Sequence, residues 1–258
     1  MQSIKLSLFS LRLTNVFLLI LCITGGLFTA EIAAQTQLEE FSAGYDLYHN
    51  GMFVGKTERS LEINDDKFTF TSIAKTAGLA AVFFDVTINE TSELYLKNNH
   101  LHFQSYRFNE IKNDESKSYH FRLEGKDSLY NSYINKNLPV ADNLQDASGF
   151  TVAVMQELLS GNQNIRYTIA EKKKLKPYFL KFVAKEVINT DHGPIQTIKI
   201  EHFDDKKNKR ITLWCAEKMG FLPIRINIIN DKGDENLLNL NHFNNKPLAL
   251  ELEDEDSE

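Results

Sequence analysis

The sequence predicts an all-β fold, an antiparallel barrel or half-barrel of about a dozen strands with one main amphipathic helix. Three observations predict it. Apolar and polar residues alternate with period two through many short segments, as in sheets with one buried and one wetter face. Turn-forming residues separate these segments at short intervals. Residues 146–159 alone have the spacing of a longer helix.

The first 34 residues have the order of a secretory signal peptide. Lys5 and Arg12 precede an apolar core at 16–23, and residues 32–34 are small or aliphatic, as a signal peptidase requires. Polar and glycine residues interrupt the apolar run near the length of about 20 residues that a membrane-spanning helix needs. We therefore predict cleavage after Ala34 and a periplasmic location, with a membrane anchor as the main alternative.

Residues 35–250 are expected to form a single exported β-domain, since their number is enough to bury a sizeable core without a disulfide or metal. Within them Cys215 is the only cysteine, so an internal disulfide is impossible. It lies in the apolar run 211–215, which favours a buried, inert thiol over a nucleophile.

The formal net charge of the whole chain is −6, and it is unevenly distributed. Residues 1–34 contribute +1 and residues 251–258 contribute −6, which leaves −1 for the body. A nucleic-acid partner would require a basic excess that this body lacks. We expect 251–258 to be an acidic, disordered, solvated tail.

The strands are clearest where the alternation is strict, at 165–169, 198–201 and 224–228. Asn50-Gly51 separates two further strand-like runs and predicts a tight hairpin. Other turns are expected at 64–67, 97–99, 191–194, 204–208 and 231–234.

Two segments depart from the strand pattern. Residues 76–84 are small and apolar and suggest a short helix or a loop that folds over an apolar opening. Residues 146–159 suggest a helix that Asp146 caps and Gly161 ends, with one apolar face. A single such helix among antiparallel strands must pack on a sheet or plug the end of a barrel; its face is formed by Phe150, Val154, Met155 and Leu158.

Catalytic and cofactor-binding motifs are not apparent in the sequence: there is no nucleophile elbow, zinc-protease helix, phosphate-binding glycine loop or paired-cysteine motif. His100 and His102 would share a strand face and could hold a metal with a third ligand. Two surface histidines at a hairpin are the simpler interpretation. The sequence thus indicates a non-enzymatic protein without a metal or cofactor.

Aromatic residues are abundant, with 18 Phe and 9 Tyr. Most of them are expected to fill a core. Pairs such as Phe68 and Phe70 could equally line a cavity, because a wide antiparallel barrel leaves space inside. The sequence leaves both a filled and a hollow interior open.

Several short motifs occur in the order of a known family. They are Tyr45-x-x-Tyr48-x-x-Gly51-x-x-x-Gly55, Ala77-Gly78-Leu79, Thr91, 101–106, Asp146-Ala147-Ser148, Thr212-Leu213-Trp214 and Gly220-Phe221-Leu222-Pro223-Ile224-Arg225. Over residues 43–243 the chain resembles an exported proteobacterial family catalogued as a domain of unknown function, number three thousand one hundred and eight.

The resemblance implies no activity and no catalytic residues. It implies a fold, because the closing strands of the family look like those of periplasmic lipoprotein carriers and sensor domains, whose half-open barrels hold acyl chains under a helical lid. Cys215 and the acidic tail depart from the family pattern.

We therefore predict a protein that binds an apolar or amphipathic small molecule, such as a lipid or acyl chain, in a β-lined cavity. The candidate ligand-binding residues are Leu79, Phe83, Trp214 and Arg225. Arg225 would be a buried charge if its strand face is interior, and an ordinary surface residue if that face is exterior. The alternative is a protein with a filled core that docks to a partner protein of the cell envelope. The oligomeric state is not indicated.

Overall fold

The computed structural model describes residues 38–190, 193–205, 208–244 and 246–247. The chain divides into Met1–Ala34 and Gln35–Glu258, and every described element belongs to the second unit. The expected signal peptide and acidic tail lie outside the described residues. Within the described part, none of the helices has the length and apolar character that crossing a bilayer requires.

The described residues form sixteen strands, two α-helices and one 3-10 helix. In chain order the elements are β1 (Phe41–His49), β2 (Met52–Asn64), β3 (Lys67–Thr76), α1 (Leu79–Phe83), β4 (Val86–Lys97), β5 (His100–Lys112), β6 (Glu115–Leu123), β7 (Ser128–Asn131), β8 (Lys136–Pro139), β9 (Leu144–Asp146), α2 (Phe150–Leu159), β10 (Asn164–Glu171), β11 (Lys174–Thr190), β12 (Gly193–Asp204), β13 (Lys209–Ala216), η1 (Glu217–Met219), β14 (Leu222–Ile229), β15 (Glu235–Phe243) and β16 (Lys246–Pro247).

One sheet contains all of these strands, in the order β8-β7-β6-β5-β4-β3-β2-β1-β15-β14-β13-β12-β11-β10-β9, with β16 beside β15. Neighbouring strands are antiparallel except β9 and β10. Tight turns produce this order. The predicted hairpin at Asn50-Gly51 is confirmed, and both residues have the positive φ (48° and 79°) that a two-residue turn of this kind needs.

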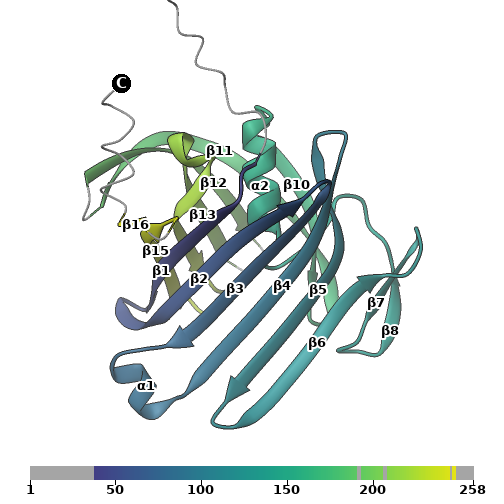
Figure 1. Ribbon diagram of the computed structural model, residues 1–258, viewed down its shortest axis with the longest axis horizontal. Helices are drawn as coiled ribbons and strands as arrows, with labels where there is room; N and C mark the ends of the chain where they lie inside the picture. Colours follow the sequence, from purple (N-terminus) through teal and green to yellow (C-terminus); the bar gives the residue numbers. More distant parts are fainter. Residues whose placement is uncertain (1–37, 191–192, 206–207, 245, 248–258) are drawn as a thin grey trace, which may run out of the picture. The chain divides into compact units, whose positions relative to one another are not determined.

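The sheet curls into an open barrel (Figure 1). Twelve strands, from β5 through β1 and β15 to β9, form a ring whose two ends meet without a backbone ladder. At this seam Gln145 Nε2 donates to the Leu101 carbonyl at 2.7 Å. Strands β6–β8 continue past the seam as a wing, which buries Phe121 and Leu129 against Leu144 and Ala170 of β9 and β10. The expected barrel or half-barrel is confirmed.

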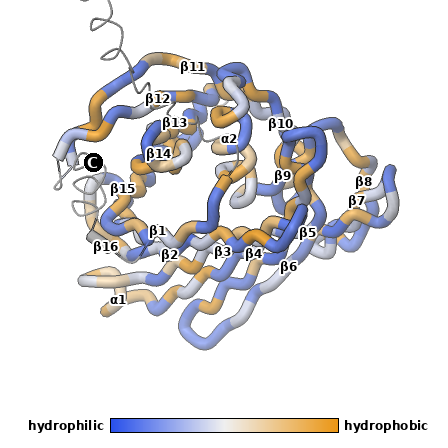
Figure 2. Tube along the Cα trace, turned by 45° about the horizontal axis from the view of Figure 1, so that its top comes forward, coloured by the Kyte–Doolittle hydropathy of each residue, from blue (hydrophilic) through white to orange (hydrophobic). Residues whose placement is uncertain are grey.

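The helix α2 lies inside the ring (Figure 2). Its predicted apolar face is buried, and so are the residues between, because a helix enclosed by a sheet has almost no solvent face; the buried set is Phe150–Gln156 and Leu158. The predicted capping by Asp146 is wrong, because the helix starts at Phe150 with Gly149 as its N-cap and has no side-chain cap bond. Asp146 ends β9, and its Oδ1 accepts bonds from the amides of Ser148 (2.8 Å) and Gly149 (2.7 Å) in the turn that precedes the helix. Of the two placements open for this helix, plugging the barrel is the one observed.

Candidate functional site

The interior of the ring changes character from one end to the other. Around α2, the inward side chains of β3 and β4 are fully buried: Phe68 and Leu94 are each 0% exposed. Further along the same strands the inward residues Ala74, Ile88 and Val86 are half-buried.

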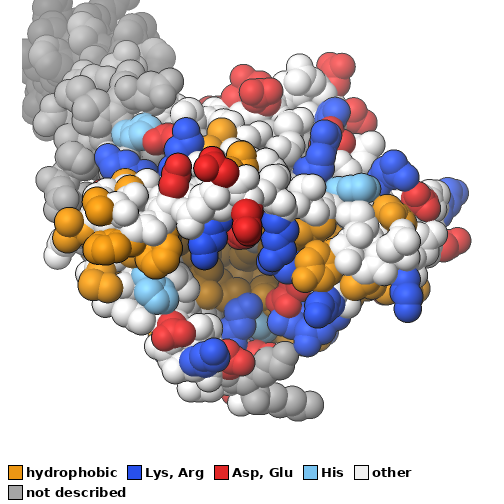
Figure 3. Space-filling model, turned by 90° about the horizontal axis from the view of Figure 1, so that it is seen from below, with side chains coloured by type: hydrophobic (Ala, Val, Ile, Leu, Met, Phe, Trp, Pro, Cys, Tyr) orange, Lys and Arg blue, Asp and Glu red, His pale blue; other side chains and the backbone are white. Residues whose placement is uncertain are grey.

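This second half of the ring is a chamber, visible as a hollow with hydrophobic side chains inside (Figure 3). A ring of about eight strands is just wide enough for its own side chains to fill, so twelve strands leave space. The helix α2 fills one half of that space, and the chamber begins at its amino-terminal end. The register of the strands places its apolar wall on Leu47, Ala74, Val86, Ile88 and Ile228.

A polar row separates the chamber from the filled half. Arg59, Ser72 and Glu90 lie opposite one another on β2, β3 and β4. The Arg59 guanidinium carbon lies 5.2 Å from the centre of the buried Tyr45 ring. Arg59 Nε is buried and has no hydrogen-bond partner among the described residues. No described carboxylate forms an ion pair with this guanidinium, so the base of the chamber carries a cation able to take another acceptor.

Two carboxyl groups, those of Glu90 and Asp146, also lie at the bottom of the chamber. Tyr106 donates its hydroxyl to Glu90 Oε1 at 2.5 Å, and Ser92 donates to Asp146 Oδ1 at 2.8 Å. Burial raises the pKa of Asp146 to about 6, although the hydrogen bonds from the Gly149 and Ser148 amides act in the opposite direction. Burial, and then the nearby Glu90, raise the pKa of the Tyr106 hydroxyl. This phenol therefore stays protonated and remains a donor.

The rim of the chamber is charged on the side of β10, β11 and β13. Glu171 forms ion pairs with Lys176 and with Lys209, whose Nζ lies 3.8 Å from Oε1. Beside them, the rings of Tyr178 and His202 stack at 4.3 Å. Burial lowers the pKa of His202, and its Nδ1 accepts a bond from the Phe179 amide at 3.2 Å. A cavity of about 420 Å³ opens at this rim.

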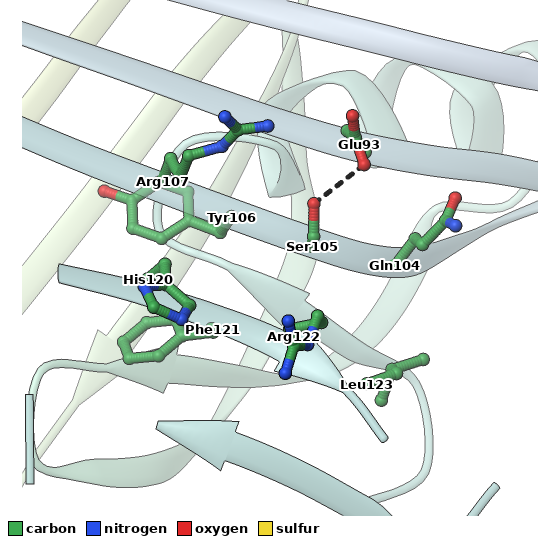
Figure 4. A pocket seen from close by; sticks show the side chains of 9 residues that line it. All are labelled: Glu93, Gln104, Ser105, Tyr106, Arg107, His120, Phe121, Arg122 and Leu123. Carbon is green, nitrogen blue, oxygen red and sulfur yellow. Dashed lines mark hydrogen bonds between the residues drawn. The ribbon is translucent and has the colours of Figure 1, made fainter. Parts of the chain in front are cut away.

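A second concavity lies on the outer face of β4–β6 (Figure 4). It has a volume of about 430 Å³ and is lined by Glu93, Gln104, Ser105, Tyr106, Arg107, His120, Phe121, Arg122 and Leu123. Several of its charges already have partners, because Glu93 pairs with Lys67 (3.4 Å) and Arg122 with Glu124 (2.7 Å). We therefore regard the chamber as the stronger candidate.

Two of the predicted site residues lie at the open end of the ring. Leu79 and Phe83 are on α1, between β3 and β4, and are 82% and 73% exposed. The helix α1 confirms the predicted short helix at 76–84. Neither side chain is enclosed by the chamber in this conformation.

Trp214 and Arg225 lie together on the outer face of the ring. The Arg225 guanidinium carbon is 5.9 Å from the Trp214 ring, and Arg225 Nε donates to Asn239 at 2.9 Å. Trp214 Nε1 donates to Glu186 at 2.8 Å, which lowers the pKa of that carboxyl. The exterior alternative for Arg225 is the observed one, and neither residue contributes to the chamber wall.

The remaining sequence candidates have local partners. His100 Nδ1 lies 2.7 Å from Glu157 Oε1, and the His102 ring stacks on Tyr95 at 5.1 Å. Cys215 is buried as predicted, and burial raises the pKa of its thiol.

Sequence reasoning missed the polar row. The sequence shows only that Arg59 shares a strand face with Thr57 and Leu61, and the burial of these two residues in the structure then places Arg59 inside the ring. Glu90 was not recognisable in this way, because the residues of β4 around it are polar on both faces.

Comparisons with known proteins agree with this architecture. The model of the family described as protein of unknown function (DUF3108) matches residues 44–238, and the chain belongs to this family. A crystal structure of a β-barrel-like DUF1849 protein from Brucella abortus is similar at 12% identity with a TM-score of 0.55, covering 81% of this chain and 98% of that one.

A DUF1089 family protein from Pseudomonas aeruginosa matches at 10% identity with a TM-score of 0.35, covering 65% of this chain and 87% of that one. No curated protein matches the sequence. The family follows from the match to the family model, and the barrel-like fold from the similarity to the DUF1849 structure.

Proposed function

We propose that this DUF3108 protein is a periplasmic, non-enzymatic carrier that binds an apolar or amphipathic small molecule, such as a lipid or acyl chain, in the chamber. One observation carries the proposal: inward apolar side chains that would be fully buried in a filled barrel, such as Ile88 and Ile228, are only half-buried. Each methylene sheltered there would contribute about 0.8 kcal/mol, so a partly enclosed chain reaches micromolar affinity.

The polar row suggests how such a ligand is oriented. An amphiphile whose polar head reaches the base of the chamber meets Arg59, whose Nε has no other described acceptor. Its chain then lies against the apolar wall toward the mouth. A head group that accepts hydrogen bonds, such as a carboxylate, suits this arrangement because bonds between charged groups are stronger than neutral ones.

A fluorescent fatty-acid probe tests the proposal. Ala74→Trp puts a large ring into the chamber, and Ile73→Trp puts the same ring on the outer face of the same strand as a matched control. We expect Ala74→Trp to weaken probe binding at least tenfold and Ile73→Trp to leave it unchanged. The probe must be extrinsic, since Trp214 faces away from the chamber.

Arg59→Met separates the roles of head and chain. It should weaken binding of fatty acids more than binding of uncharged alcohols of the same chain length. Native mass spectrometry of the protein purified from the producing cells should detect a retained lipid. If no lipid co-purifies and no amphiphile binds below about 100 μM, a free energy of only about −5.5 kcal/mol, the carrier proposal is wrong.

The rival proposal is a protein that docks to a partner protein of the cell envelope. The exposed apolar side chains of α1 favour it. Under this alternative Ala74→Trp would change nothing, whereas substitutions on α1 would abolish cross-linking to a defined partner.

A further inference from the structure

Five large apolar side chains gather at the open end of the ring and face solvent. They form the apolar tip, which consists of Met52 (67% exposed), Leu79 (82%), Val82 (76%), Phe83 (73%) and Phe84 (52%). Met52 starts β2, which contacts α1. Scattered exposed apolar residues are ordinary on protein surfaces, but a contiguous group of this size indicates a contact surface.

The tip is held in place without burying its own side chains. The helix α1 has no buried residue. Polar bonds fix it instead: Thr76 Oγ1 donates to the Phe84 carbonyl at 2.8 Å and accepts from the Val86 amide at 3.1 Å. The Ala77 amide also bonds to Val54 of β2 at 3.1 Å. The fold therefore presents these side chains outward in a fixed arrangement, which folding alone does not explain.

The charges around the tip favour a lipid surface. Residues 71–84 contain Lys75 and no acidic residue. Lys56 lies opposite Lys75 on β2, and Lys112 Nζ is 5.6 Å from the centre of the Phe84 ring. Asp85 is the first acid along the chain after the tip. Lysines behind an apolar insertion suit a bilayer that carries anionic head groups.

The size and position of the tip also favour a lipid surface over a protein partner. A stable protein interface buries about 800 Å² on each partner with about 20 residues, far more than five side chains provide. The tip connects β3 and β4, whose last inward residues, Thr76 and Val86, belong to the open half of the ring. A bilayer that receives the tip would therefore face the mouth of the chamber.

We propose that the apolar tip inserts into the interface of an anionic lipid bilayer and docks the open end of the ring on the membrane. The proposal does not require the chamber to be occupied. Leu79, Val82 and Phe83 would enter the boundary between head groups and acyl chains, while Lys56, Lys75 and Lys112 would contact phosphate groups.

Vesicle flotation tests this docking. The protein is purified as cells export it, its amino terminus is identified by intact mass, and it is mixed with vesicles of phosphatidylethanolamine and phosphatidylglycerol, or of phosphatidylcholine alone. We expect flotation with the anionic vesicles, and at least a tenfold smaller bound fraction for Leu79→Ser combined with Phe83→Ser. Val183→Ser combined with Val187→Ser is the matched control, because both valines are 49% exposed and lie on β11 outside the tip.

Lys75→Gln combined with Lys112→Gln should reduce the preference for anionic vesicles, and the variant should still bind weakly to both the anionic and the phosphatidylcholine vesicles. The proposal is wrong if the wild-type protein floats with neither vesicle, or if the tip variant floats as well as the wild type. It is also wrong if the wild type elutes as a dimer that the tip variant converts to a monomer. The Ala74→Trp protein should still float, so failure of docking and failure of chamber binding are distinguishable.

Discussion

On β14, Ile226 and Ile228 lie two residues apart and point into the same ring, yet Ile226 is 3% exposed and Ile228 is half-buried. The same contrast recurs on β4 between Leu94 and Ile88. The strands on both sides of this boundary have similar alternation, so the walls do not cause the difference. The cause is α2, which fills one half of a ring that is too wide to be filled by its strands. The two halves should therefore respond differently to the same substitution.

The largest difference between the two halves is expected when a valine inside the ring is replaced by a charged residue, at Val154 of α2 or at Val86 of β4. Val154→Asp would bury an unpaired carboxylate at a position that is 0% exposed, and should destabilise the protein by more than about 4 kcal/mol or prevent folding. Val86→Asp makes the same change in the open half, where water reaches the side chain, and should change the stability by less than about 1.5 kcal/mol. Urea denaturation measures both. Equal losses would mean that the open half is as closed to water as the filled half.

Removing apolar volume should give a smaller difference in unfolding free energy between the two halves. Ile226→Ala leaves a cavity in the filled half and should lower the free energy of unfolding by about 2–5 kcal/mol. Ile228→Ala removes the same atoms beside the chamber and should lower it by about 1 kcal/mol, since little packing is lost. A fatty-acid ligand should raise the unfolding temperature of the Ile226→Ala protein more than that of the Ile228→Ala protein, because only the latter loses ligand contacts.

Asp146 makes the boundary between the halves sensitive to pH. Its pKa is about 6 in the folded protein against an ordinary value of 3.8, so between these values the folded state holds a proton that the unfolded state has lost. Stability should therefore fall as the pH rises through this window, by about 3 kcal/mol at most at about 1.36 kcal/mol per unit. Asp146→Asn cannot titrate and should lack this decline. An unchanged pH profile in the variant would assign the decline to other groups.

The smallest effect is expected outside both halves. Leu79→Glu combined with Phe83→Glu alters two side chains that are more than 70% exposed, and the unfolding free energy should change by no more than about 0.5 kcal/mol. Thermal unfolding followed by circular dichroism measures this. A large loss of stability would show that α1 packs against the ring in solution, which would make it a structural element rather than a contact surface.

Much of the fold was predictable from local patterns. The alternation at 165–169, 198–201 and 224–228 identifies strands of β10, β12 and β14, and the Asn50-Gly51 turn is where it was expected. The sequence underestimated the number of strands because β7, β8 and β9 have only three or four residues, too few to display a period. The turn expected at 231–234 separates β14 from β15, whereas those at 191–194 and 204–208 are only partly described.

The site was less accessible from the sequence because it depends on which face of the sheet is inside. Trp214 and Arg225 alternate correctly with buried neighbours, but alternation alone does not distinguish an inner polar residue from an outer one. Arg59 was distinguishable only once Thr57 and Leu61 were known to be buried. That α2 occupies only one half of the ring, with its amino-terminal end at the boundary, is a tertiary property with no local signal, and it is what leaves the chamber open.

The seam between β5 and β9 gives the ring a built-in capacity to change its circumference. Elsewhere around the ring, widening would break a continuous ladder of backbone bonds, whereas at the seam it would stretch the side-chain bonds from Gln145 to the Leu101 carbonyl and from Ser92 to Asp146, and would move the wing relative to β9 and β10. Because neighbouring strands share backbone hydrogen bonds everywhere else in the ring, a change in its diameter is expected to occur at this seam. The amides of β9, which pairs only with β10, should therefore exchange with solvent faster than those of β1, which pairs with a strand on each side.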